Sequence, residues 1–128
     1  MRLTVFHDYE PEPLWVKSLN KLLEPMDFSE IQKLGRVHLA VFNDGVVGIS
    51  VTNENRIVYL KVRDITRRRG VGRYLLEETN RFVLNEYDNV SIDTCIFPQE
   101  EQDGLTYFLE TQGYVKSAAN DKIFIFRD

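Results

Sequence analysis

Residues 60–78 read LKVRDITRRRGVGRYLLEE, and this segment passes from an apolar strand through arginines and glycines into an amphipathic helix. After the glycines, the residues of one helix face recur at helical spacing; they are Val71, Leu75, Leu76, Thr79, Phe82 and Val83. The loop therefore lies at a helix N-terminus, where unpaired N–H groups and the helix dipole favour an anion. Gly70 and Gly72 would let the backbone approach that anion without a Cβ in the way.

Basic residues are concentrated in this one segment. It holds six of the 16 basic residues, although the net charge of the whole chain is -4; they are Lys61, Arg63, Arg67, Arg68, Arg69 and Arg73. A local positive site on an acidic chain indicates a small polyanion as the ligand. Nucleic acid would need a broader basic face with interleaved aromatic residues. The remaining alternative is that these arginines bind no ligand and form a solvated start of the helix that only keeps the chain soluble.

The composition is that of a small globular protein. With 128 residues, 43% of them hydrophobic, the chain is expected to form one domain over residues 1–128 around a single core. No apolar run approaches the roughly 20 residues that span a bilayer, and residues 1–8 become polar too early for a secretory signal. We therefore expect a cytoplasmic protein without a membrane or nucleic-acid partner.

Cysteine and histidine are too scarce for several kinds of site. Cys95 is the only cysteine, so no internal disulfide can form, and its apolar surroundings predict a buried, inert thiol. Neither His7 nor His38 has a sequence context that suggests a partner for a catalytic cysteine. One cysteine and two histidines also fall short of a metal-site pattern, so we expect no metal.

The pattern of apolar residues and turn signals predicts a mixed α/β chain. A hairpin is expected around Asn43-Asp44-Gly45, because Asp-Gly tolerates the positive φ angles of a tight turn. Ser29 is the expected cap of a short helix that ends at Gly35, and residues 98–102 are expected to be a loop. Strands are predicted at 2–7, 37–42, 46–52, 56–62, 90–96 and 123–127, and the other helices at 14–23, after Gly70, and at 104–112 before Gly113.

This order of elements resembles the Gcn5-related N-acetyltransferase (GNAT) superfamily. Residues 67–72, RRRGVG, match its acyl-CoA signature R-x-x-G-x-G, and Gly113-Tyr114 is similar to the end of its second motif. The resemblance implies an α/β (α+β) fold whose mixed central sheet has flanking helices. The sheet would be splayed between the strand at 56–62 and the strand near Val90. The pantetheine arm of acetyl-CoA or CoA would lie in that splay, with the pyrophosphate on residues 67–73.

The superfamily's catalytic residues are missing from this chain. An acetyltransferase benefits from a base for the amine and an acid for the CoA thiolate. The acid is often a tyrosine four residues before the glycine that ends the second motif, and that position here is Leu109. Tyr107 is two residues away, which rotates it by about 200° around a helix. The strand at 56–62 offers no carboxylate, and Glu54 could serve only through water. We predict no catalytic residue; an N-acetyltransferase acting on an unknown amine is the alternative.

A closer resemblance is to the aspartate decarboxylase maturation factors, the PanM or PanZ family. It rests on the chain length, the opening MRLT, the Phe42-Asn43 turn and, above all, residues 60–78. This resemblance implies a regulator that binds CoA or acetyl-CoA and promotes self-cleavage of the aspartate 1-decarboxylase zymogen, PanD. Cleavage forms the pyruvoyl enzyme that makes β-alanine for pantothenate synthesis, so the regulator would tune that pathway.

The family resemblance also implies a set of site residues. Asn43 would lie on the hairpin that faces PanD, with Arg68 and Arg69 as further candidate contacts at the rim. The free protein is expected to be a monomer. The implied cofactor-binding residues are Leu60, Lys61, Val62, Thr66, Arg67, Arg68, Arg69, Gly70, Val71, Gly72, Arg73, Glu100, Glu101, Gln102 and Asp103.

Overall fold

The computed structural model of the chain describes residues 3–63 and 70–127. Its strands form one mixed sheet with the order β1-β2-β3-β4-β5-β7-β6. The strands are β1 (Thr4–His7), β2 (Arg36–Phe42), β3 (Gly45–Asn53), β4 (Arg56–Val62), β5 (Asn89–Asp93), β6 (Val115–Lys116) and β7 (Ile123–Arg127). The helices are α1 (Val16–Leu23), α2 (Phe28–Gln32), α3 (Val71–Leu84) and α4 (Gln99–Thr111), with short 3-10 turns at Pro13–Trp15 and Thr94–Ile96.

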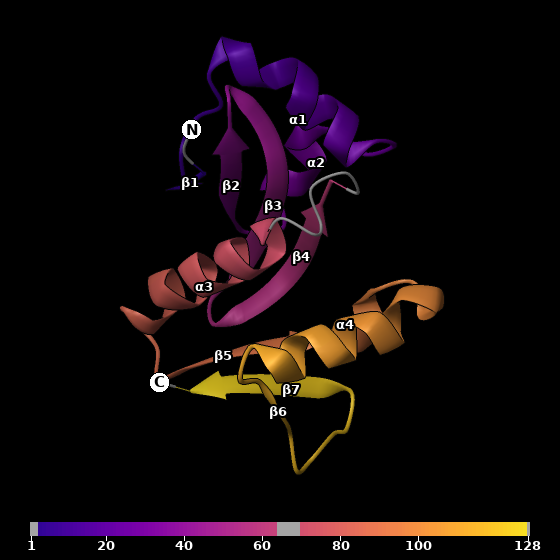
Figure 1. Cartoon of the computed structure of the whole chain (residues 1–128). Coiled ribbons are helices and arrows are strands. Elements are labelled where there is room, and N and C mark those ends of the chain that lie inside the picture. Colours follow the sequence, from indigo (N-terminus) through magenta and orange to yellow (C-terminus); the bar gives the residue numbers. More distant parts are fainter. Residues whose placement is uncertain (1–2, 64–69, 128) are drawn as a thin grey trace.

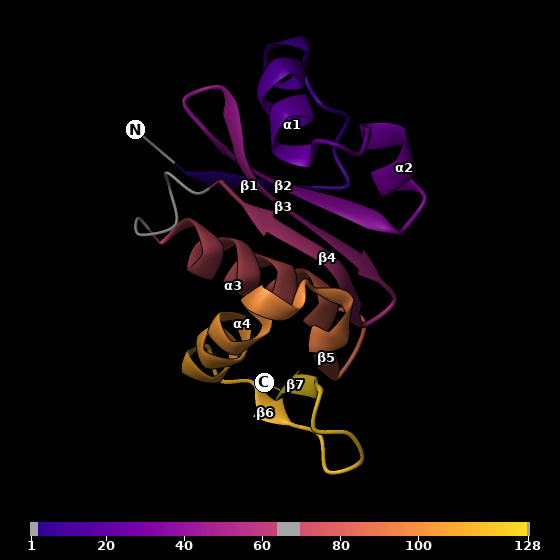
Figure 2. The same ribbon diagram turned by 90° about the vertical axis from the view of Figure 1, so that its right-hand side faces the viewer.

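The helices cover both faces of the sheet. Figures 1 and 2 show α1 and α2 on one face of the strands β1 to β4, and α3 and α4 on the other side. Leu19 of α1, Ile31 of α2 and Trp15 of the 3-10 turn before α1 pack onto β2 and β3. Leu76 and Leu109 pack from the second pair against β5 and β7. The expected fold class, an α/β domain with a mixed sheet and flanking helices, is confirmed.

Of two local turn predictions, one is refined by the structure and one needs correction. The predicted hairpin is present: Phe42 pairs with Gly45, so its two-residue loop is Asn43-Asp44, with φ angles of 51° and 62°, and Gly45 begins β3. Both central residues of a type I′ turn need positive φ, and Asn and Asp tolerate it better than most side chains. The cap of α2 is Asp27, not Ser29: its carboxylate accepts from the Glu30 N–H, while Glu30 reaches back to the Asp27 N–H.

The region after α3 also differs from the expectation. β5 ends at Asp93, because the Asp93 carboxylate accepts from the Cys95 N–H (2.9 Å) and turns the chain into a 3-10 turn. Cys95 is therefore exposed, and the prediction of a buried thiol was wrong. Residues 98–102 are not a loop, since α4 already begins at Gln99 behind Pro98. The short strand β6 was not predicted.

Two classes of site are not found in the part of the chain that the structure describes. Within residues 3–63 and 70–127, no group of three or more His, Cys, Asp or Glu side chains could hold a metal ion. Over the same residues, no helix is long and apolar enough to cross a membrane.

Candidate functional site

The sheet opens between β4 and β5. These parallel strands pair only at Arg56 with Ser91 and at Ile57 with Ile92. Beyond Ile57, β4 continues to Val62 and pairs on its other side with β3. The predicted splay is therefore present. Leu60, Lys61 and Val62 lie on the part of β4 that β5 does not pair with, where an extended ligand can bond to the strand edge.

The start of α3 lies at the mouth of this opening. Gly70 is the N-cap with a φ of 76°, which explains why a glycine is needed there. Among the described residues, no side chain caps the helix, so its first N–H groups suit an anionic ligand. A Cβ placed on Gly72 would lie 3.7 Å from Val62 Cγ2, which shows that the first turn of α3 meets the end of β4.

The structure thus brings together two of the predicted groups of cofactor-binding residues. The group on β4 lies beside the group Gly70, Val71, Gly72 and Arg73 in the first turn of α3. Thr66, Arg67, Arg68 and Arg69 lie outside the described residues, so the structure does not place them.

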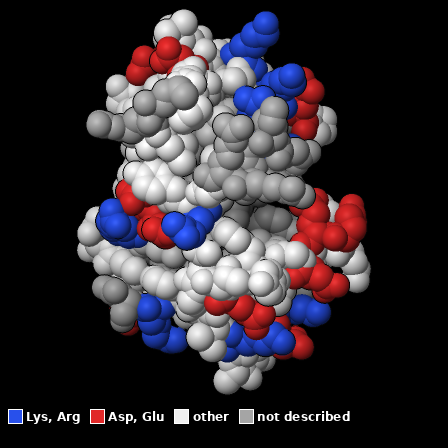
Figure 3. All heavy atoms as spheres, viewed as in Figure 1, with Lys and Arg blue, Asp and Glu red and all other residues white. Residues whose placement is uncertain are grey.

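The third predicted group is the acidic one. Glu100, Glu101, Gln102 and Asp103 occupy the first turns of α4, and Gln102 Nε2 donates to the Phe97 carbonyl (2.9 Å). Figure 3 shows acidic atoms gathered over the beginning of α4. Acidic residues favour the N-terminus of a helix through its dipole, which gives Glu100 and Glu101 in the first turn a structural reason for their positions.

Lysine and arginine side chains near the opening have partners on the protein itself. Lys61 Nζ donates to the Glu24 carbonyl between α1 and α2 (3.4 Å). Arg73 Nε lies 3.3 Å from Glu77 Oε1 one turn along α3, and both side chains are at least half exposed. Exposed ion pairs of this kind contribute little to stability. Arg73 can therefore exchange Glu77 for a more strongly charged ligand.

The positions at which a transferase would carry its acid do not suit proton transfer. Leu109 is fully buried in the core against β5 and β7. Tyr107 is 72% exposed on another face of α4. Tyr114 is buried and its hydroxyl donates to Asn80, and burial raises the pKa of Tyr114, so its proton is held tightly.

Asn43, the residue implied for partner binding, lies at the exposed tip of the β2–β3 hairpin. The Ser18 hydroxyl of α1 accepts from the Val46 N–H (2.8 Å) and anchors the base of this hairpin. The tip is therefore held in place by α1.

Sequence reasoning missed a pair of histidines on the α3 side of the sheet, of which His38 is buried and His7 half-buried. His7 and His38 lie opposite each other on β1 and β2, and their Nδ1 atoms are 2.8 Å apart. His38 Nε2 bonds to Thr52 Oγ1 (2.8 Å), and both rings contact Phe82 of α3. Burial, with the charges of His7 and Arg36, lowers the pKa of His38 to about 3. Only the register of β1 against β2 could have revealed the pair.

Comparison with known proteins places the chain among acetyltransferase-like domains. A family model described as the acetyltransferase (GNAT) domain of PanZ matches residues 24–122. A PanD regulatory factor of Salmonella typhimurium is 40% identical over 65 residues, which are 48% of each chain. The PanD regulatory factor of Escherichia coli is 46% identical over 50 residues, 36% of this chain and 39% of that protein. The aligned part thus spans about half the length of these relatives or less.

Solved structures extend the likeness in fold over the whole chain. A putative N-acetyltransferase, YhhK from E. coli bound to coenzyme A, superimposes with a TM-score of 0.78 at 23% identity and covers 100% of both chains. A GNAT family acetyltransferase from Elizabethkingia anophelis with acetyl-CoA bound has a TM-score of 0.68 at 16% identity, with 98% of each chain covered. Taken with the splayed sheet and the uncapped start of α3, the family match over most of the chain shows that this protein belongs to the PanZ family of GNAT domains.

Proposed function

We propose that this protein binds CoA or acetyl-CoA in the opening between β4 and β5 and, when loaded, promotes self-cleavage of the PanD zymogen. The observation that carries the proposal is that β4 continues beyond its last pair with β5, at Ile57, as far as Val62, where it meets the first turn of α3. Among the described residues, no side chain caps that helix start. Two solved relatives in fold contain CoA or acetyl-CoA, and two relatives in sequence are PanD regulatory factors.

The residues in the opening suit such a cofactor. The edge of β4 at Leu60, Lys61 and Val62 would hold the amide-containing pantetheine arm, and the N–H groups at the start of α3 would hold the pyrophosphate. The arginines of residues 67–73 would add charge-assisted contacts to the phosphates. Bound acetyl-CoA would supply an acyl group, and its binding would signal the supply of CoA.

Regulation is favoured over acetyl transfer by the side chains around the site. Leu109 stands where the family resemblance expects the tyrosine acid, and its buried alkyl side chain has no proton to give to the CoA thiolate. The described part of β4 carries no carboxylate to accept a proton from an amine. Among the described residues, the opening suits a bound cofactor, and neither Leu109 nor β4 offers an acid or base for acetyl transfer.

Replacing Arg67 by Glu should severely weaken CoA binding in titration calorimetry. Loss of one charge-assisted contact is worth about 1.5–3 kcal/mol, roughly a tenfold to hundredfold change in affinity, and the new carboxylate adds repulsion. Arg81→Glu makes the same charge change at the far end of α3, where Arg81 pairs with Glu78, and should leave CoA affinity nearly unchanged. Equal affinity in wild type and Arg67→Glu would exclude the assigned phosphate site.

Conversion of purified PanD zymogen should be faster with this protein and acetyl-CoA together than with either alone or with neither. A ligand-gated regulator must bind its target better when loaded, and typical couplings are about 1–3 kcal/mol, or roughly 5–150-fold. Cleaved chains would be followed by denaturing gel in all four mixtures. The same rate in each would refute the role in maturation.

Asn43→Gly tests the partner-facing hairpin in the same assay. Glycine accepts the positive φ of this position, so the hairpin keeps its turn while the side chain is lost. The variant should slow zymogen cleavage while binding CoA as wild type does. If zymogen cleavage with Asn43→Gly were as fast as with wild type, the Asn43 side chain would not contribute to PanD binding.

A further inference from the structure

A cavity of about 360 Å³ lies between α3 and the end of α4, and its size is within the range of small-molecule sites, about 300–1,000 Å³. Leu76, Asn80 and Leu84 line one side of it, because residues four apart share one face of a helix. Gln112, the C-cap of α4, and Phe126 of β7 line the other sides. Three elements that are far apart in sequence thus build the cavity together.

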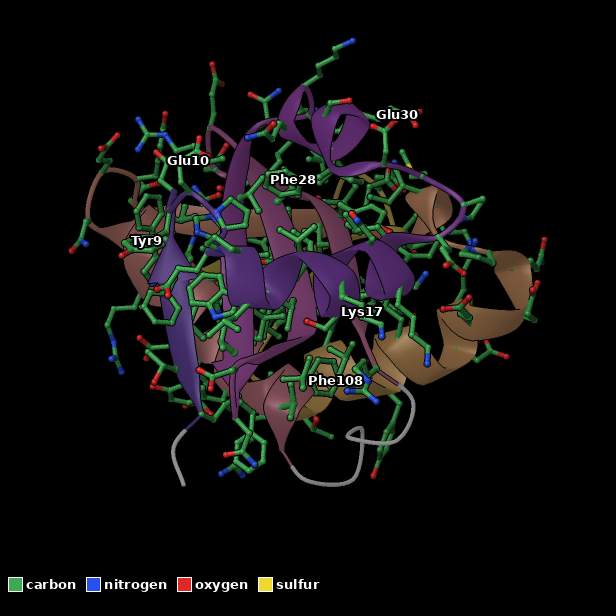
Figure 4. The ribbon with its side chains drawn as sticks, turned by 90° about the horizontal axis from the view of Figure 1, so that it is seen from above. Tyr9, Glu10, Lys17, Phe28, Glu30 and Phe108 are labelled. Carbon is green, nitrogen blue, oxygen red and sulfur yellow. The ribbon has the colours of Figure 1, made fainter. Side chains whose placement is uncertain are left out.

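The cavity is distinct from the opening between β4 and β5. Phe108 reaches from α4 toward the sheet (Figure 4), and its Cζ lies 3.6 Å from the position of a Cβ on Gly72 in the first turn of α3. The lining of the cavity begins only at Leu76, one turn further along α3, and includes no residue of β4. An occupant of the cavity would therefore contact other residues than the proposed cofactor.

Asn80 presents an unused hydrogen-bond donor to this cavity. The residue is 4% exposed, and its Oδ1 accepts from the Tyr114 hydroxyl, which fixes the orientation of the amide group. Within the described residues, Asn80 Nδ2 has no partner, and no side-chain nitrogen or oxygen is both unpartnered and fully enclosed. Nδ2 therefore reaches the cavity. Since an unpaired donor at a nearly buried position is costly, a ligand that accepts from Nδ2 would supply the missing bond.

The charged side chains at the cavity favour a ligand without net charge. Glu77 and Arg81 carry opposite charges, so their sum at the cavity is zero. Each is also balanced by a neighbour on α3: Glu77 Oε1 lies 3.3 Å from Arg73 Nε, and Arg81 Nη1 lies 2.8 Å from Glu78 Oε2. A neutral ligand leaves both ion pairs intact.

We propose that this cavity binds a small neutral amide. The carbonyl oxygen of the ligand accepts from Asn80 Nδ2, and its N–H donates to the side-chain oxygen of Gln112. An apolar group of the ligand lies against Leu76, Leu84 and Phe126, as is typical of sites with few polar groups in an apolar lining. This site is additional to the proposed CoA site and does not depend on it.

The test titrates 3-phenylpropanamide into ¹⁵N-labelled protein and follows the amide resonances by NMR. Saturable shifts are expected for the Asn80 side-chain amide, for residues 76–85 and for Gln112, with half-saturation on the order of a few millimolar for so small a probe. 3-Phenylpropanoate has the same skeleton with a carboxylate in place of the amide and should bind more weakly. No saturable shift at these residues up to about 20 mM amide would overturn the inference, and equal binding of the carboxylate would overturn the choice of a neutral amide.

Two variants locate the probe. Asn80→Asp keeps an acceptor for the Tyr114 hydroxyl but loses the N–H donor, so amide affinity should fall roughly fivefold or more, whereas Asn20→Asp on the exposed face of α1 should bind as wild type does. Leu84→Trp fills the cavity from its half-buried wall without touching the Asn80–Tyr114 bond and should abolish the shifts in a folded protein. Wild-type affinity in Leu84→Trp would place the probe elsewhere and overturn the inference.

Discussion

Lowering the pH from 6.5 to 4 is expected to reduce the free energy of unfolding by about 3 kcal/mol through His38 alone. The folded-state pKa of His38 is about 3, against 6.5 for an ordinary histidine, because the ring is fully buried. The unfolded chain therefore takes up a proton first as the pH falls. The stability is fully present above pH 6.5 and is lost progressively as the pH falls toward 3.

Neighbouring groups modify this effect without reversing it. Burial also lowers the pKa of His7, while Glu78 of α3 acts in the opposite sense. Arg36 adds a positive charge on the strand that carries His38. The shared Nδ1–Nδ1 hydrogen bond tolerates one added proton but not two, because two N–H donors would then face each other.

Urea unfolding at a series of pH values measures the effect, with His38→Gln as the comparison. Glutamine does not titrate and keeps a donor and an acceptor for Thr52 and His7. Its free energy of unfolding should fall more slowly between pH 6.5 and 4, by about 1.2 kcal/mol per pH unit on average. If the free energies of unfolding of wild type and His38→Gln fell in parallel with pH, His38 would not be the cause of the acid sensitivity.

Gly35→Ala should lower the free energy of unfolding by about 3 kcal/mol or more, which lies at the severe end for a single substitution. The added Cβ would lie 2.2 Å from the Thr52 carbonyl oxygen and 2.9 Å from its carbon. These are backbone atoms of β3 where it pairs with Arg36 of β2, so no side chain can rotate to make room. The start of the β2–β3 ladder has to move.

The comparison for this variant is Gly104→Ala, the same chemical change in the exposed part of α4, where an added Cβ meets no described atom within 4 Å. That substitution should stabilise the protein by about 0.5–1 kcal/mol, because alanine replaces glycine in a helix interior. Chemical denaturation of both variants would give opposite signs. If Gly35→Ala lowered the free energy of unfolding by less than about 1 kcal/mol, the backbone of β3 at Thr52 would be able to shift at little cost, contrary to this prediction.

The fold could be predicted from sequence where local signals and hydrophobic pattern agree. β4 and β7 have the predicted bounds, 56–62 and 123–127, and α3 begins directly after Gly70. Where a local interaction or a proline sets the end of a strand or the start of a helix, the hydrophobic pattern gave the wrong bounds. The Asp93 carboxylate ends β5 early and exposes Cys95, and Pro98 starts α4 within a segment whose polarity is typical of a loop.

The candidate site was only partly accessible from sequence. The motif in residues 60–78 locates one strand and one helix end that are adjacent along the chain. The contact of Phe108 with the start of α3 and the His7–His38 pair join residues that are far apart in sequence, through contacts that only the folded chain creates. No periodicity or spacing within a single segment carries that information.

The sparse pairing between β4 and β5 has a consequence for cooperativity. Leu75 and Leu76 are neighbours on α3, yet Leu75 packs with Ala40 and Val47 beneath β2 and β3, while Leu76 packs with Ile92 and Phe124 of β5 and β7. Within the described residues, the two parts are joined by this helix, by two residue pairs in the sheet and by a few contacts such as the Asn55–Asn89 hydrogen bond. Weakly joined units of this kind can open separately, as local unfolding units. If the proposed cofactor binds between them, it would join the two parts, and its release would let each part fluctuate more independently.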